Sequence, residues 1–261
     1  MIAAIRSEIR KLFSVRSTYI ITAFAYALLL FLSLYVIGYR TGKSVATDLG
    51  GNLYLASSLV RNANVLSIFV GIISLLLFAH EYRYSTIMYT LTNQKSRTKV
   101  LASKISVVAL FTFIYTLIGM GIALGGMVLG LHLSGGTMPH QTFDVLNYTL
   151  KLLAFTEGYA LAALLIITLV RNQVAAITVL LILPGTFEGF LGLLLKHNSV
   201  YMPFTALSQV TNPPDVIAAA TQGQTPMNGY LSPVNGVLVF AAYLVGGWLI
   251  AWFLFRRRDA N

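Results

Sequence analysis

Residues 105–131 read ISVVALFTFIYTLIGMGIALGGMVLGL, an unbroken run without a single charged side chain. A helix needs about 20 mostly apolar residues to cross the roughly 30 Å hydrocarbon core of a bilayer, and this run is long enough. Helices are the expected form, because backbone polar groups in lipid must be satisfied within the segment. The stretch therefore predicts a transmembrane helix.

Five further apolar stretches give the same prediction. They cover residues 17–39, 62–80, 150–170, 174–195 and 234–255. The composition agrees, since 57% of the 261 residues are hydrophobic and 10% are charged, whereas soluble proteins carry about 25% charged residues. We predict an all-α membrane protein of six transmembrane helices, forming a single domain over residues 1–261.

The lysines and arginines predict the orientation of these helices. With a cytoplasmic N-terminus, most of the 18 basic residues fall in cytoplasmic segments, as is usual in membrane proteins. The exceptions are Arg40, Lys43, Arg61, Lys151 and Lys196. We therefore expect both termini to be cytoplasmic. The net charge of +10 does not indicate a nucleic-acid partner, because the basic residues sit between long apolar runs rather than on one soluble face.

The segment before the first span, residues 2–15, has its own pattern. Apolar side chains recur at helical spacing among charged ones, namely Ile2, Ile5, Ile9, Leu12 and Phe13. This pattern is typical of an amphipathic helix that lies in the membrane interface and contacts membrane lipids. The alternative is that the segment simply extends the first span.

No catalytic, cofactor-binding or metal-binding site is predicted. The chain has no cysteine, which excludes thiolate chemistry. His80 and Glu81 begin the zinc-protease pattern H-E-x-x-H, but Tyr84 stands where the second histidine is needed. We expect a protein without its own active site.

The most distinctive segment, residues 81–100, links the second and third spans. It carries a set of residues suited to contact with a soluble partner, namely Glu81, Arg83, Thr86, Ile87, Met88, Leu91 and Arg97. The apolar members can pack into a groove, as amphipathic helices do. The basic members can stay near anionic headgroups. The alternative is an ordinary basic cytoplasmic loop.

This segment resembles the type-2 class of ABC exporter permeases. The residues that match the pattern of that class are Glu81, Thr86, Leu91, Ser96, Arg97 and Lys104. Ser85 replaces the usual glycine and Gln94 the usual proline, so the local turns differ. The layout of the whole chain also fits, from an amphipathic entry helix through six spans to a long broken segment before the last one.

The resemblance implies a function as the membrane-spanning permease subunit of an ATP-driven exporter. Two permease subunits, identical or similar, would form the pathway, and two copies of a separate ATPase subunit would bind ATP and receive residues 81–97. It also implies a multi-pass protein of the cell membrane, and a compact permease without a fused ATPase is expected in a prokaryote. The alternatives are a gradient-driven carrier, a membrane sensor subunit that does not transport, and, as the most remote, an intramembrane enzyme.

Two acidic residues fall inside predicted spans, Glu157 and Glu188. Intramembrane carboxylates are costly and often functional, so both are candidates for lining a pathway or gate. The alternative for each is a hydrogen-bonded or interfacial carboxylate. Pairs such as Gly121 with Gly125 and Gly126 with Gly130 favour close helix packing within one subunit. The alternative is that they pack at the contact between two subunits of a dimer.

Overall fold

The computed structural model describes residues 2–41, 64–83, 97–135, 145–211 and 231–257. These ranges are almost entirely helical, and none of their residues forms a strand. In chain order, the elements are α1 (Ile2–Ser14), α2 (Arg16–Phe31), η1 (Leu32–Thr41), α4 (Val65–Arg83), α6 (Arg97–Ser134), α7 (Val145–Val170), α8 (Gln173–Ile182), η2 (Leu183–Phe187), α9 (Glu188–Leu195), η3 (Lys196–Tyr201), α10 (Pro203–Ser208) and α12 (Pro233–Arg257).

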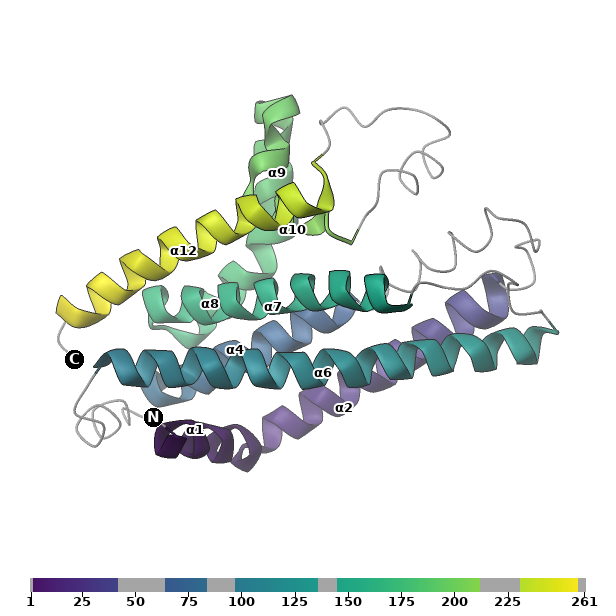
Figure 1. The fold of residues 1–261 in the computed structure, drawn as a ribbon, viewed down its shortest axis with the longest axis horizontal. Coiled ribbons are helices and arrows are strands. Elements are labelled where there is room, and N and C mark those ends of the chain that lie inside the picture. Colours follow the sequence, from purple (N-terminus) through teal and green to yellow (C-terminus); the bar gives the residue numbers. More distant parts are fainter. Residues whose placement is uncertain (1, 42–63, 84–96, 136–144, 212–230, 258–261) are drawn as a thin grey trace.

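Six helical segments in the described ranges are long and apolar enough to cross a membrane. They are Arg16–Arg40, Val65–Tyr82, Thr98–Ser134, Val145–Val170, Gln173–Tyr201 and Pro233–Leu254. This confirms the predicted class, an all-α membrane protein with six candidate spans. Helix α4 lies in the middle of the bundle, in contact with α2, α7 and α8. The start of α6 and the end of α12 lie at the same end of the molecule (Figure 1).

Three spans begin earlier or end later than their apolar stretches predicted. The third helix begins at Arg97 instead of residue 105, the fourth begins at Val145, and the fifth span continues to Tyr201. In the third helix, Lys104 is fully buried among opposite charges while Lys99 stays exposed. Charged residues at a span end can therefore remain helical, and a search for uncharged runs cuts the helix short.

Helix α1 is separate from the first span. Val15 interrupts the helix with an extended backbone at φ −91° and ψ 120°. The chain then starts again as α2, which η1 continues with π-helical geometry. The prediction of a distinct N-terminal helix is confirmed, whereas its position in a membrane interface stays a prediction.

The first and third spans cross at a pair of glycines. A Cβ atom on Gly130 would lie 2.8 Å from the Cα atom of Gly38 and would also meet the carbonyl oxygen of Leu34. Gly126, one turn earlier, fits against the side chain of Ser33 in the same way. These glycines serve packing within one subunit, as predicted. Gly121 and Gly125 face open space, with nothing described within 4 Å of an added Cβ.

The fifth span is broken at Pro184. Proline has no N–H, so it cannot donate to the carbonyl of the residue one turn before it. That carbonyl belongs to Leu180, and it accepts a hydrogen bond from the Tyr159 hydroxyl of α7 at 3.1 Å instead. The chain then passes through the π-helical η2, and α9 projects away from the bundle (Figure 1).

Candidate functional site

Four charged side chains from three helices meet in one cluster. Helix α1 supplies Glu8 and Lys11, α4 supplies Glu81, and α6 supplies Lys104. The Nζ atom of Lys11 lies 2.6 Å from Oε1 of Glu8 and 2.6 Å from Oε1 of Glu81. The Nζ atom of Lys104 lies 2.7 Å from Oε2 of Glu8 and 3.0 Å from Oε1 of Glu81. We call these four residues the charge cluster.

The charge cluster is electrically balanced, and three of its four members are buried while Lys11 is partly exposed. Glu8 and Lys104 are 0% exposed and Glu81 is 4% exposed. Buried charges are tolerated only when they are paired and hydrogen-bonded, and here each carboxylate meets both ammonium groups. Lys104 also stands over the ring of Phe78, 4.7 Å from its centroid, which gives the ammonium a further favourable contact.

The sequence of α1 brings its charges to the bundle together with its apolar residues. Ile5, Glu8 and Leu12 recur at helical spacing, so they lie on one face. Leu12 is buried, and Ile5 packs against the core of the bundle. The apolar contacts and the ion pairs therefore dock α1 onto α4 and α6 through the same face.

The pKa values in α1 reflect this pairing. Burial alone would raise the pKa of Glu8, but the ammonium groups of Lys104 and Lys11 outweigh it and hold the pKa below its ordinary value of 4.5. Burial alone would lower the pKa of Lys11, but its hydrogen bonds to Glu8 and Glu81 outweigh it and raise the pKa above 10.5. Both groups are therefore charged at neutral pH.

The charge cluster lies at the base of the predicted partner-binding segment. Glu81 stands shortly before the end of α4 at Arg83, and Lys104 stands in the second turn of α6, which begins at Arg97. The ion pair between them therefore joins the two helix ends from which residues 84–96 extend. Helix α1 is fixed to the same point through Glu8 and Lys11.

The other predicted partner-binding residues are described only in part. Arg83 and Arg97 are the last residue of α4 and the first of α6. Thr86, Ile87, Met88 and Leu91 lie outside the described residues. Their contact with a partner therefore stays a prediction.

Sequence reasoning did not find the role of Glu8 and Lys11. It grouped them with the other charged residues of the amphipathic helix, apart from its apolar residues. One signal was available, because Glu8 is the first of only 8 acidic residues and stands in a basic segment three positions before Lys11. A lone acid among basic residues on a membrane helix is a candidate for a buried ion pair.

Glu188 is a buried, hydrogen-bonded carboxylate. Its Oε1 accepts from the backbone N–H of Phe204 at 2.9 Å, and its Oε2 accepts from the N–H and the hydroxyl of Thr205 at 2.6 and 2.7 Å. These N–H groups belong to the first turn of α10, where a helix has no internal acceptors. Glu188 thus caps α10 from the start of α9 and holds the two helices together.

Glu188 also borders a cavity. The cavity measures about 610 Å³ and lies between η2, α9, η3 and α10, with Pro184, Gly189, Lys196 and Met202 among its lining residues. Glu157 lies elsewhere, on the middle of α7, where it is half-buried. Within the described part of the chain, Glu157 forms no ion pair, and the structure does not bring the two acids together.

The chain matches a known protein family. The family model described as "ABC-2 family transporter protein" matches residues 4–186. The matched range contains the whole charge cluster and residues 84–96, and it ends just before Glu188. No curated protein matches the chain.

Proposed function

The chain belongs to the ABC-2 family of transporter proteins, and from this premise we propose that it is the permease subunit of an ATP-driven exporter coupled to a separate ATPase. Membership of this family supports a membrane component of an ABC transporter without catalytic activity of its own. The six candidate spans provide the membrane part of such a subunit. ATP is bound and hydrolysed by the partner.

One observation carries the coupling part of the proposal, the ion pair between Glu81 and Lys104. It ties the end of α4 to the start of α6, so residues 84–96 extend from a single anchored base. A force that the ATPase exerts on this segment reaches both helices at once, because they cannot separate without exposing a buried charge.

Helix α1 extends this coupling along the edge of the bundle. Glu8 and Lys11 bind the same two residues that anchor the segment. A displacement of the segment by the partner therefore moves α1, α4 and α6 as one unit. We propose that this unit transmits the movement of the ATPase to the rest of the permease.

The proposal includes a second permease copy. Among the described helices, we assign the contact with this copy to α9. This helix projects from the bundle (Figure 1). It also exposes large apolar side chains. They are Phe190, Leu193, Leu194 and Leu195. A short apolar helix that exposes this much surface among the described residues has surface to offer to a neighbouring subunit.

This dimer contact is testable because the chain has no cysteine. A single Leu193→Cys substitution should allow a disulfide-forming oxidant or a short bifunctional reagent to link two copies in native membranes. Leu146→Cys on α7, which is equally exposed at 71% against 75%, is the matched control. Cross-linking of both variants to the same extent contradicts a contact specific to α9.

The proposed orientation places both termini in the cytoplasm of a cell, with the protein in the cell membrane. The distribution of basic residues supports it. The arrangement of the helices also supports it, because the starts of α1, α6 and α8 and the end of α12 lie at one end of the bundle (Figure 1).

The proposed pathway residues are Glu157 and Glu188. The cavity beside Glu188 supports its placement near a route through the protein, and Glu157 is a half-buried carboxylate within α7, where a charge is costly unless it has a function. The cap on α10 gives Glu188 a structural task as well. Movement of α9 relative to α10 would break these hydrogen bonds, so the same carboxylate can act as a gate.

The proposal is tested by purifying the tagged chain from its native membrane in mild detergent and identifying the proteins that accompany it. A soluble ATPase should co-purify. The triple variant Glu81→Ala, Thr86→Ala, Leu91→Ala should lose it, while the control variant Val145→Ala, Leu146→Ala, Leu150→Ala, exposed positions on α7, should keep it.

Two results contradict the coupling assignment. The first is a chain that purifies without any ATPase from a membrane that shows no ATP-dependent activity of this protein. The second is an ATPase that stays bound to the triple variant as firmly as to the unaltered chain. Loss of the ATPase from both triple variants would show that the loss is not specific to residues 81–97.

A further inference from the structure

A second apolar cavity of about 480 Å³ lies between α6, α7 and α12. Cavities of this volume are typical of sites for small ligands. Its lining residues are Thr98, Leu101, Ala102, Ile105, Leu161, Ala241, Leu244, Val245, Trp248, Leu249 and Trp252. Every one of them except Thr98 is apolar or aromatic. We call this cavity the α6–α12 groove.

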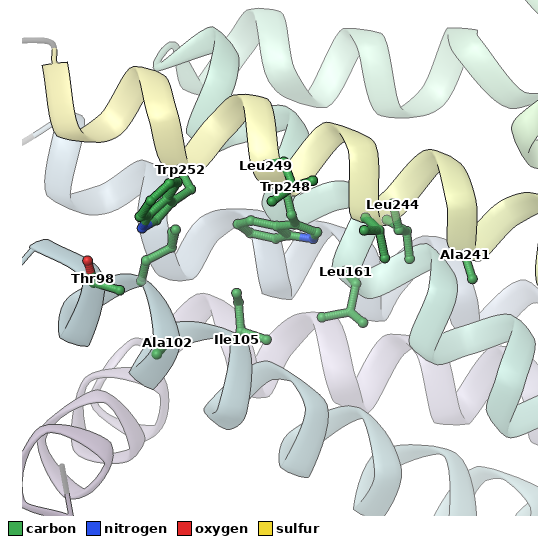
Figure 2. A pocket seen from close by; sticks show the side chains of 11 residues that line it. Thr98, Ala102, Ile105, Leu161, Ala241, Leu244, Trp248, Leu249 and Trp252 are labelled. Carbon is green, nitrogen blue, oxygen red and sulfur yellow. The ribbon is translucent and has the colours of Figure 1, made fainter.

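Two facing helix stripes form the walls of the groove. On α12, the lining residues run from Ala241 to Trp252 at helical spacing, and on α6 they run from Thr98 to Ile105. Figure 2 shows the indole rings of Trp248 and Trp252 reaching from α12 toward α6. Both stripes are mostly apolar, and their side chains do not fill the space between the two helices.

The length of the groove corresponds to one leaflet of a bilayer. Ala241 and Trp252 are three helical turns apart, and at 1.5 Å per residue they span about 16 Å. The hydrocarbon core of a membrane is roughly 30 Å thick, so this is about half of it. One acyl chain of a lipid in one leaflet has the length and the apolar character that the groove requires.

One end of the groove lies where the candidate span of α12 ends, which is the depth expected for the membrane surface. Thr98 is the first residue of its candidate span, and Trp252 stands just before the end of its own at Leu254. Tryptophan is enriched at this depth, where the ring contacts both hydrocarbon and headgroups. A lipid whose chain occupies the groove would hold its headgroup beside these two residues.

The charges at this end favour an anionic headgroup. Helix α6 begins with Arg97, Thr98 and Lys99, and Lys99 is exposed. Helix α12 ends with Arg256 and Arg257. The nearby charge cluster is balanced and does not offset these basic residues. Basic residues between transmembrane helices at the membrane surface are typical of sites for anionic lipid headgroups.

We propose that the α6–α12 groove binds one acyl chain of an anionic phospholipid from the surrounding bilayer, with its headgroup at the basic ends of α6 and α12. The lipid fills the space that the two helices leave open and holds α12 against α6. This site is separate from the cavity beside Glu188, whereas its headgroup end overlaps the end of the predicted partner-binding segment at Arg97, Thr98 and Lys99.

The test uses the purified full-length chain in non-ionic detergent, with dioleoylphosphatidylglycerol and dioleoylphosphatidylcholine as probes. Native mass spectrometry counts the bound lipid, and a thermal unfolding scan measures its effect. The anionic lipid should bind at least tenfold more tightly than the zwitterionic one and should raise the unfolding temperature. Equal binding of the two lipids contradicts the headgroup assignment.

Substitutions test the apolar groove and the basic headgroup end of the site independently. Ala102→Phe fills the groove with an apolar ring and should lower the affinity for the anionic lipid at least tenfold. Ala242→Phe, the matched control, lies next to the lining residue Ala241 but faces away from the groove, and it should bind lipid normally. Lys99→Glu should abolish the preference for the anionic lipid over the zwitterionic one.

A further variant keeps the proposal testable if Ala102→Phe does not fold. Ala241→Phe fills the deep end of the groove, and it should shift the preference toward shorter acyl chains. Undiminished binding of the dioleoyl lipid to a folded Ala102→Phe or Ala241→Phe variant overturns the proposal. So does a loss of self-association in Ala102→Phe, since it would show that a second copy occupies the groove.

Discussion

Oε1 of Glu81 and Nζ of Lys104 lie 3.0 Å apart, although the two residues stand on either side of the segment predicted to contact the ATPase. Both side chains are buried, and both also bind a partner on α1. This ion pair holds the end of α4 against the start of α6, at the two helix ends that residues 84–96 connect.

Removal of Lys104 should destabilise the protein strongly. In Lys104→Met, Glu8 and Glu81 would share only Lys11, and an unbalanced buried carboxylate costs about 3–5 kcal/mol. Thermal unfolding in detergent should show a large drop in midpoint. Lys99→Met, which changes an exposed lysine on the same helix, should show almost none.

The double variant Glu8→Gln, Lys104→Met checks that charge balance is the cause. It leaves the pair of Lys11 and Glu81 intact, so it should be more stable than Lys104→Met alone. A double variant as unstable as the sum of the two single ones contradicts the account.

Stability should fall on acidification through the titration of Glu8. Its folded-state pKa is lowered, so its contribution is present above the ordinary value of 4.5 and is lost as the pH falls through the folded value. Lys11 has a raised pKa, so its contribution is present below 10.5 and is lost only as the pH rises above that value.

Unfolding temperatures measured from pH 7 down to pH 3 should therefore decline below about pH 4.5, and less steeply in Glu8→Gln. Lys11, which faces Glu8 beside Lys104, has a raised pKa and remains charged throughout this range. An identical decline in the unaltered chain and in Glu8→Gln would assign the effect to other groups.

Gly130 should not tolerate a side chain. In Gly130→Ala, the added methyl group would meet the backbone of Gly38 and Leu34, and overpacking of this kind typically costs 1–3 kcal/mol. Gly121→Ala is the matched control, because the same group on the same helix meets nothing within 4 Å. Comparable unfolding temperatures for the two variants would contradict the crossing of η1 and α6.

The class of fold was predictable from the sequence because long apolar runs such as 105–131 indicate helices that lie in lipid. The ends of the helices were not predictable from the sequence. Helix α6 continues back to Arg97, and Lys104 within this extension is neutralised by residues on two other helices, which no local pattern records. The break at Pro184 was predictable, since proline lacks the N–H that a helix needs there.

The candidate site was predictable only in part. Glu81 and Lys104 stand at recognisable positions, whereas Glu8 and Lys11 looked like the polar face of an interfacial helix. The cap that Glu188 provides to α10 depends on the chain returning to it at Phe204 and Thr205. Contacts between segments far apart in the chain come from the tertiary fold, so sequence spacing alone does not reveal them.

Glutamine substitutions test the proposed pathway role of the intramembrane acids. Glu157→Gln and Glu188→Gln should each reduce transport in the assembled complex several-fold while the ATPase rate falls much less, because charge in the pathway acts on cargo rather than on ATP. Unchanged transport in both variants removes the idea. A parallel loss of both activities in Glu188→Gln would assign that residue to the cap on α10 alone.

The most direct test of the central claim is cross-linking of residues 81–97 to the ATPase in native membranes. Because the chain has no cysteine, Leu91→Cys introduces a single attachment point for a short photoreactive reagent, and Leu146→Cys on α7 is the control. The account predicts a covalent adduct between the Leu91→Cys chain and a soluble ATPase, with a yield that changes when ATP is added. The absence of that adduct, or an equal yield from Leu146→Cys, would contradict coupling through this segment.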